Sequence, residues 1–275
     1  FSDILIVPEA LGQPYHFRDQ GGIGMDFPLD SVERIAGLRE PKALREHLAY
    51  VPAALRLVRR ELGETHALLG FAGSPWTLAC YMVEGGSSEH FGRIKALARQ
   101  EPAQFESLLK KLTDAVAELL LMKIEAGADA VQLFDSWGAA CPGNAYEAWS
   151  LRWIREIIRR LPAGFPVILF AKGMGAHLPA LAETGASVLS LDWTMDMPVA
   201  RAQLDGLSLG TPVALQGNLD PVLMSGPPEL VRVAAQHLLD SMRGKPGHIV
   251  NLGHGIHPDA RLESVQALVE TVTNG

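Results

Sequence analysis

The sequence predicts an α/β fold built around a buried parallel sheet. Short apolar, β-branched runs alternate with segments of helical length, and the runs lack the alternation of polar and apolar residues that is typical of antiparallel strands. Hydrophobic residues make up 48% of the 275 residues and charged residues 20%, so a sizeable core is available. Because no fixed-period repeat or low-complexity linker interrupts the chain, a single domain is the simplest interpretation.

Six apolar runs are predicted to be strands, and the apolar opening, residues 1–7, is predicted to be a seventh strand or the tail of one that starts before Phe1. Eight strands close a (β/α)8 barrel, which typically takes about 250 residues. We therefore predict a (β/α)8 TIM barrel, a single domain over residues 1–275, that lacks its first strand and most of its second in this chain. The six runs are residues 67–71, 130–134, 167–170, 188–191, 213–215 and 249–252.

The helix predicted over residues 103–126 is the clearest, because its apolar residues share one face and Gly127 ends it. Ser74 and Pro75 read as an N-cap and a first helical position, which predicts a short helix that passes Tyr81 and stops at Gly85. Residues 12–29 are glycine-rich and show little periodicity, so we expect a functional or mobile cover over the site. Further helices are predicted over residues 43–62 with a break before Pro52, 144–160, 229–242 and 260–273.

Composition and charge exclude several classes of function. The net charge of -7 and the absence of a basic run argue against binding to nucleic acid or to anionic membranes. No run approaches the roughly 20 apolar residues of a membrane-spanning helix, and the opening residues do not resemble a signal peptide. Cys80 and Cys141 are too few for a disulfide framework, so we expect free thiols and a cytoplasmic protein.

Active sites of parallel barrels lie at the carboxyl ends of the strands, so the polar residues that follow each run are the candidates for chemistry. Asp3 is flanked by apolar residues, where a carboxylate is costly unless it is paired or used, although it could equally cap the next turn. The full set of candidates is Asp3, Ser74, Asp135, Ser136, Lys172, Asp192, Gln216, Asn218, Asp220 and His254.

The histidine and aromatic candidates can each be interpreted in two ways, as functional residues or as structural ones. His254 lies between two glycines and could exchange a proton with a substrate near neutral pH, or it could be a hydrogen-bonded structural residue. A metal site at His254 and His257 would need a third ligand, and no cysteine lies next to them. Aromatic residues could line a pocket or simply pack in the core, and these are Phe71, Trp76, Tyr81 and Phe134.

Five segments, in this order along the chain, resemble the uroporphyrinogen decarboxylase family: residues 1–5 (FSDIL), 70–78 (GFAGSPWTL), 81–86 (YMVEGG), 215–221 (LQGNLDP) and 251–255 (NLGHG). The resemblance spans the chain. It implies a (β/α)8 barrel, a homodimer, and decarboxylation, without cofactor or metal, of the four acetate groups of uroporphyrinogen III to give coproporphyrinogen III in haem synthesis.

The resemblance also implies roles for individual residues. Asp3 would accept hydrogen bonds from the pyrrole N–H groups at the centre of the tetrapyrrole and act, with Tyr81 and His254, in catalysis. Tyr81, Ser136 and His254 would bind substrate carboxylates or polar edges, and Phe71 and Phe134 would contact the macrocycle. The family's pattern includes an arginine-rich segment upstream of the position of Phe1, which this sequence does not contain.

Two alternative functions remain open on the sequence. One is a zinc-dependent corrinoid-type methyltransferase of the same superfamily, for which a His-x-Cys pair and a distal cysteine would be expected, but neither Cys80 nor Cys141 stands in such a pair. The other is a catalytically inactive protein that binds tetrapyrroles.

Overall fold

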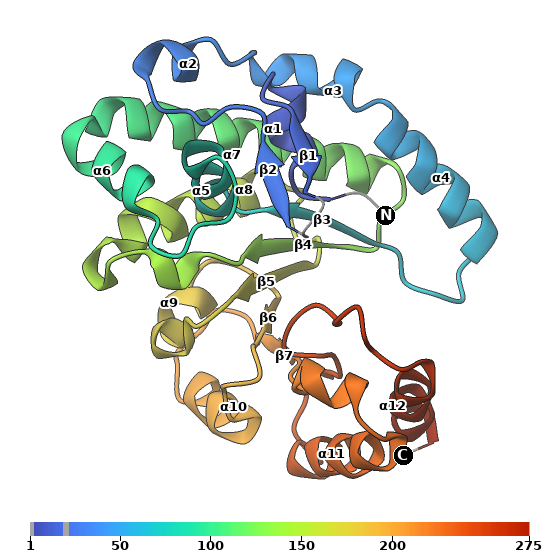
Figure 1. The fold of residues 1–275 in the computed structure, drawn as a ribbon. Coiled ribbons are helices and arrows are strands. Elements are labelled where there is room, and N and C mark those ends of the chain that lie inside the picture. Colours follow the sequence, from blue (N-terminus) through green and yellow to red (C-terminus); the bar gives the residue numbers. More distant parts are fainter. Residues whose placement is uncertain (1–2, 19–21, 275) are drawn as a thin grey trace. The chain divides into compact units, whose positions relative to one another are not determined.

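The computed structural model describes residues 3–18 and 22–274, and the chain divides into two compact units, residues 1–167 and 168–275. The single domain over residues 1–275 stays a prediction. The six predicted strands are confirmed as β3 (Leu69–Gly73), β4 (Ala130–Asp135), β5 (Val167–Ala171), β6 (Val188–Ser190), β7 (Ala214–Gln216) and β8 (His248–Ile249). Figure 1 labels β3 to β7. No helix in the described part of the chain is long and apolar enough to cross a membrane.

The prediction of a strand over residues 1–7 is wrong for the residues that the structure describes, while Phe1 and Ser2 lie outside them. Ile4 and Leu5 form a turn, and helix α1 (Ile6–Ala10) follows. A short apolar run fits a buried strand and a buried helix equally well, so periodicity alone could not separate them. The side chains of Ile6 and Val7 are buried as expected, but on a helix.

The glycine-rich segment after α1 is an antiparallel hairpin of β1 (Tyr15–Phe17) and β2 (Ile23–Met25) (Figure 1). Hydrogen bonds attach it to the end of helix α5 (Pro75–Glu84): the Met25 N–H donates to the Gly85 carbonyl oxygen at 3.1 Å, and the buried Gln13 Nε2 donates to the Met82 carbonyl oxygen at 2.9 Å. The described part of the segment is therefore fastened to the helix that carries Tyr81.

Helix α5 has the boundaries that the sequence predicts. The Ser74 hydroxyl caps it by accepting from the Thr77 N–H at 3.0 Å, and Pro75 takes the first helical position. At the other end Gly85 has φ +81°, a left-handed conformation that favours glycine. Strand β3 precedes α5 and pairs with β4 in parallel, with Phe71 opposite Gln132 and Gly73 opposite Phe134.

The predicted helix over residues 103–126 is confirmed as α7 (Pro102–Glu125). The predicted helix over 43–62 is observed as α3 (Leu44–His47) and α4 (Tyr50–Leu62), so that the break falls just before Tyr50 and Pro52 lies in the first turn of α4. The predicted helix over 144–160 is a π-helical segment, η4 (Glu147–Leu151), continued by α8 (Arg152–Arg160). The unit also contains α2 (Val32–Ala36), α6 (Gly92–Gln100), and the 3-10 segments η1 (Pro41–Ala43), η2 (Gly138–Ala140) and η3 (Gly143–Ala145).

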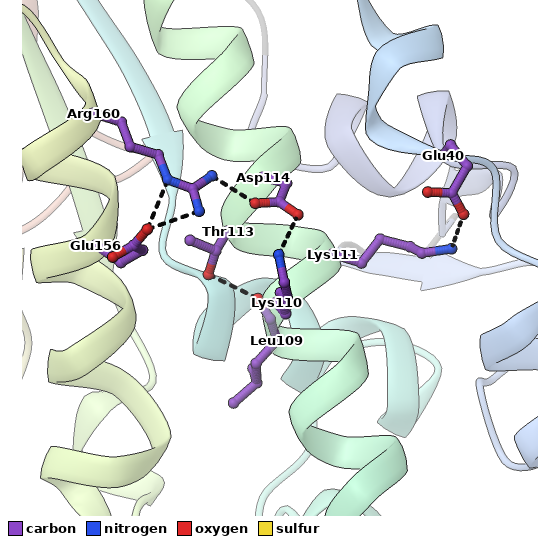
Figure 2. Close-up of polar contacts among 8 residues, drawn as sticks. All are labelled: Glu40, Leu109, Lys110, Lys111, Thr113, Asp114, Glu156 and Arg160. Atoms are coloured by element: carbon purple, nitrogen blue, oxygen red, sulfur yellow. Dashed lines mark hydrogen bonds and ion pairs between the residues drawn. The ribbon is translucent and has the colours of Figure 1, made fainter.

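Helices α7 and α8 are joined by ion pairs on their outer faces (Figure 2). Arg160 of α8 bonds Asp114 of α7 through Nη1 and Oδ1 at 2.5 Å, and the other oxygen of Asp114 pairs with Lys110 Nζ at 3.1 Å. Glu156 completes the group on α8, while Lys111 pairs with Glu40 at 3.0 Å. Such exposed pairs contribute at most about 1 kcal/mol each. The apolar face of α7 therefore dominates this packing.

The second unit carries the parallel strands β5 to β8, each paired with the next along the chain. Helices α11 (Pro228–Ser241) and α12 (Leu262–Asn274) confirm the two helices predicted there. The connections hold α9 (Leu178–Ala182), α10 (Met197–Asp205), and the 3-10 segments η5 (Gly175–His177) and η6 (Pro221–Ser225). Because the strands are parallel, their carboxyl ends meet at one edge.

Candidate functional site

Asp3 precedes α1 in a turn rather than at the end of a strand, and both of its carboxylate oxygens accept hydrogen bonds. Oδ1 accepts from the Leu5 N–H at 2.5 Å, which is the local turn expected of a capping aspartate. Oδ2 accepts from the hydroxyl of Tyr15 on β1. Burial and the bond to Asp3 raise the pKa of Tyr15, so its hydroxyl stays protonated and donates. Sequence reasoning missed Tyr15, which gave no signal beyond being a polar aromatic residue in a glycine-rich segment.

The residue after Asp3 lies against the carboxyl end of β3. A Cβ added at Gly73, the last residue of β3, would come within 3.3 Å of the Ile4 Cβ and within 2.9 Å of the Leu78 side chain. The absence of a side chain at Gly73 therefore lets the chain that carries Asp3 pack closely against the end of β3. This contact brings Asp3 to the edge at which parallel α/β proteins place their active sites.

Tyr81 lies on α5, two turns beyond the end of β3, and is partly buried. Its ring centroid is 5.8 Å from that of Trp137, which in turn lies 4.9 Å from that of Phe91. Burial raises the pKa of the Tyr81 phenol, so it is a hydrogen-bond donor across the physiological pH range. The aromatic ring in contact with Tyr81 is that of Trp137, which was not among the predicted pocket residues Phe71, Trp76 and Phe134.

Phe71 and Phe134 project from neighbouring strands and make an edge-to-face pair, with ring centroids 5.9 Å apart and planes at 83°. Both rings are partly buried. Lys123 of α7 lies over the Phe71 ring at 4.5 Å and donates to the Phe71 carbonyl oxygen at 2.5 Å. Phe71 and Lys123 also line a pocket of about 390 Å³ between α4 and β3. Burial lowers the pKa of Lys123 to about 8.

Asp135 ends β4 inside the protein, where its side chain is fully buried and accepts bonds from four hydroxyl groups. Oδ1 accepts from Ser74 at 2.6 Å and Thr77 at 3.3 Å, and Oδ2 from Tyr146 and Ser150 at 2.8 Å each. Burial raises the pKa of Asp135, while these bonds oppose that shift.

The carboxylate of Asp135 therefore ties the start of α5 to the π-helical segment η4. The sequence offered one clue to this cluster, because Tyr146 and Ser150 are four residues apart, the spacing that places both on one helical face. Ser136 follows Asp135 directly and is partly exposed, so the same cluster fixes the backbone from which Ser136 projects.

His254 follows β8 in the second unit and is exposed. Its ring makes edge-to-face contacts with Phe170 at 6.0 Å and with Trp193 at 6.1 Å between centroids. Partial desolvation of the ring lowers the pKa of His254, and the charge of Lys172 lowers it further, so the neutral imidazole predominates near pH 7. Of the predicted site residues, the first unit contains Asp3, Phe71, Tyr81, Phe134 and Ser136, and the second contains His254.

The two glycines on either side of His254 differ in the space around them. A Cβ at Gly253 would come within 2.3 Å of the Trp193 nitrogen, whereas a Cβ at Gly255 would meet nothing within 4 Å. We expect Gly253→Ala to destabilise the protein by about 1–3 kcal/mol, since the backbone after β6 must move aside. Gly255→Ala is the matched control, and its midpoint of urea unfolding should stay close to that of the wild type. Equal midpoints for both variants would contradict this packing.

Neither cysteine is poised for thiolate chemistry. Cys80 is fully buried on α5, and burial raises the pKa of both Cys80 and Cys141. Across residues 3–18 and 22–274, no three His, Cys, Asp or Glu side chains gather in a group that could hold a metal ion. The expected free thiols are confirmed.

Parallel strands that end in polar residues define an α/β protein of the barrel type, and solved structures share this fold. A methyltransferase from Methanosarcina mazei matches with a TM-score of 0.81 at 20% identity, over 100% of this chain and 78% of that one. A putative vitamin-B12-independent methionine synthase from Listeria monocytogenes matches with a TM-score of 0.56 at 14% identity, over 81% and 67%. At these identities the likeness concerns the fold alone.

Sequence comparison identifies the family. The family model described as uroporphyrinogen decarboxylase (URO-D) matches residues 1–275. The uroporphyrinogen decarboxylase of Methylococcus capsulatus is 45% identical over 99% of this chain and 77% of its own length, and that of Thioalkalivibrio sulfidiphilus is 43% identical over the same shares. The chain belongs to the uroporphyrinogen decarboxylase family, which confirms the resemblance inferred from the five sequence segments.

Proposed function

We propose that this protein is a decarboxylase that converts the four acetate side chains of uroporphyrinogen III to methyl groups and yields coproporphyrinogen III. The family match over the whole chain carries this proposal, together with the relatives above 40% identity. For each side chain the net change is the loss of one carbon dioxide and the gain of one proton at the former methylene carbon. Tetrapyrrole biosynthesis needs four such steps per substrate molecule.

The chemistry explains the need for a fixed negative charge. Direct loss of carbon dioxide would leave an unstabilised carbanion, so a pyrrole carbon is protonated first and the ring then accepts the electron pair of the breaking bond. Protonation of the methylene carbon and loss of the ring proton restore the pyrrole. The ring is cationic after each of the two protonations, and a preorganised carboxylate would stabilise it by several kcal/mol, roughly as oxyanion-hole donors stabilise an anion. We assign this role to Asp3.

The contacts of Asp3 support that assignment. The Leu5 N–H and the Tyr15 hydroxyl hold the carboxylate in one orientation. A carboxylate that is already oriented loses little freedom when pyrrole N–H groups bind to its remaining lone pairs. Tyr81, Ser136 and His254 then bind carboxylates or polar edges of the substrate, and Phe71 and Phe134 contact the macrocycle.

We expect Tyr15→Phe to lower kcat by about tenfold, because a bond to a charged group contributes about 1.5–3 kcal/mol and here orients the carboxylate. The charge of Asp3 remains, so the loss should be smaller than that from removing it. Steady-state rates with uroporphyrinogen under anaerobic conditions measure this effect. A Tyr15→Phe variant with wild-type kcat would show that the Leu5 N–H suffices to hold Asp3.

The experiment that tests the function is anaerobic incubation with uroporphyrinogen III followed by chromatographic separation of the oxidised products. We expect intermediates with seven, six and five carboxylates and finally coproporphyrinogen. Binding without any loss of carboxylates would favour the tetrapyrrole-binding alternative. Stoichiometric zinc that is required for activity, with methyl transfer to a thiol, would favour the methyltransferase alternative. The proposed homodimer in the cytoplasm is checked by sedimentation of the purified protein and by cell fractionation.

A further inference from the structure

A carboxylate-binding position can be inferred at the carboxyl ends of the parallel strands of residues 168–275. Lys172 follows β5 directly, Trp193 follows β6, and His254 follows β8, so all three residues are at the edge where parallel strands present functional groups. The indole of Trp193 links the other two: Lys172 Nζ lies 5.6 Å from its ring centroid, and the His254 ring lies 6.1 Å from it.

The ammonium group of Lys172 lacks a carboxylate partner. Among the described residues no Asp or Glu oxygen lies within ion-pair distance of Lys172 Nζ, although the lysine is partly buried. The nearby Asp192 is committed elsewhere, since it accepts from the Gly173 N–H at 2.6 Å and from the Thr194 N–H at 2.9 Å. A partly buried cation that forms no ion pair with a described carboxylate is well suited to bind an anion.

The surroundings of Lys172 favour an anion attached to an apolar or aromatic body. Trp193 remains 39% exposed beside the ammonium group. This is a large exposed fraction for a tryptophan that contacts both a lysine and a histidine ring. His254 supplies a second polar edge on the same indole. An inorganic anion would pair with the ammonium group but would make no apolar contact with the indole.

We propose that Lys172, Trp193 and His254 form a carboxylate-binding subsite in which Lys172 recognises the charge and Trp193 contacts the apolar body that carries it. This inference rests on the proposed function for the identity of the natural ligand, an acetate or propionate side chain of the tetrapyrrole. The proposed subsite can be tested separately from catalysis, because its three residues and their contacts all lie in the second unit. We assign Lys172 a role in binding alone; other groups transfer the protons.

The test combines substrate kinetics with a probe that is not a tetrapyrrole. Lys172→Gln should raise KM for uroporphyrinogen by about tenfold, as expected for the loss of one charge-assisted hydrogen bond, with kcat within about twofold. Lys172→Arg should restore most of the affinity. Lys245→Gln, which removes the other lysine of the second unit, is the matched charge control and should leave KM unchanged.

The probe is benzenehexacarboxylate, titrated into the protein while the indole N–H of Trp193 and the ring of His254 are followed by NMR. We expect saturable shifts of both signals in the wild type and in Lys172→Arg, and at least about tenfold weaker binding in Lys172→Gln. Saturable shifts in a protein that shows no decarboxylation would refute the proposed function and retain the subsite. Normal turnover and normal KM in Lys172→Gln would retain the function and overturn the subsite.

The histidine titration gives a readout that general destabilisation would not produce. The titratable groups that act on His254 are Lys172, His257 and Asp192; Lys172 and His257 lower its pKa, while Asp192 raises it. Removing the charge of Lys172 should therefore raise the pKa of His254 in the ligand-free Lys172→Gln variant. An unchanged pKa would place the ammonium group too far from the imidazole for a shared subsite and would overturn the proposal.

Discussion

Asp3→Asn is expected to lower kcat by about a hundredfold or more and to leave the protein folded. Asparagine has the same shape and can still accept a hydrogen bond from the Leu5 N–H, so the turn before α1 should survive. What disappears is the negative charge that would oppose the developing positive charge on the pyrrole, an effect of several kcal/mol in other preorganised sites, where losing one group costs about 10²–10³ in rate. Anaerobic turnover of uroporphyrinogen measures kcat, and circular dichroism monitors the fold.

A second carboxylate in the same part of the chain provides the control for Asp3. Asp26 is exposed and pairs with His16 at 2.8 Å, so Asp26→Asn removes an equal charge without touching the turn. Its kcat should stay within about twofold of the wild-type value, because exposed ion pairs contribute little. If Asp3→Asn and Asp26→Asn were equally active, Asp3 would be a capping residue and the central carboxylate would have to be sought elsewhere.

Asp135→Ala is expected to cost more than about 3 kcal/mol of folding free energy, because it leaves four hydroxyl groups in the core without their common acceptor. The cost should appear as a lower midpoint of denaturant unfolding. Tyr146→Phe removes a single donor from the same carboxylate and should cost about 1.5–3 kcal/mol, less than Asp135→Ala. The contrast separates the loss of the whole cluster from the loss of one bond.

An exposed aspartate supplies the control for Asp135. Asp259 lies in an exposed segment after β8, so Asp259→Ala should change stability by no more than about 0.5 kcal/mol. A loss for Asp135→Ala no larger than that for Asp259→Ala would contradict a role for the buried carboxylate in fastening α5 to η4. Folded Asp135→Asn protein with wild-type stability would show that the charge of Asp135 is dispensable and that its shape and remaining oxygen suffice.

The strands and the long helix were predictable from the sequence because their signals are local. Residues 102–125 place their apolar side chains on one helical face, and Gly127 follows, so α7 could be located to within a residue at each end. Residues 4–7 are apolar, and such a run fits either type of element, so the prediction of a strand failed over the described residues 3–7. The side chains of Ile6 and Val7 are nonetheless buried.

The candidate site was predictable as a set of residues but not as a set of contacts. Asp3, Tyr81 and His254 stand out because they follow apolar runs or belong to the family's motifs. The Tyr15 hydroxyl on Asp3 depends on a hairpin whose attachment to α5 no local pattern reveals. Likewise, Gly253 is required by the backbone at Trp193, which is 60 residues away in the sequence.

The central claim is most directly tested by counting the carbon dioxide released from uroporphyrinogen III labelled with ¹³C in its acetate carboxyl groups. The account predicts four labelled carbon dioxide molecules per tetrapyrrole, no label from the propionate groups in a separately labelled substrate, and loss of most of this release in Asp3→Asn. Recovery of the bound substrate with all eight carboxylates intact, under anaerobic conditions and at saturating protein, would contradict it.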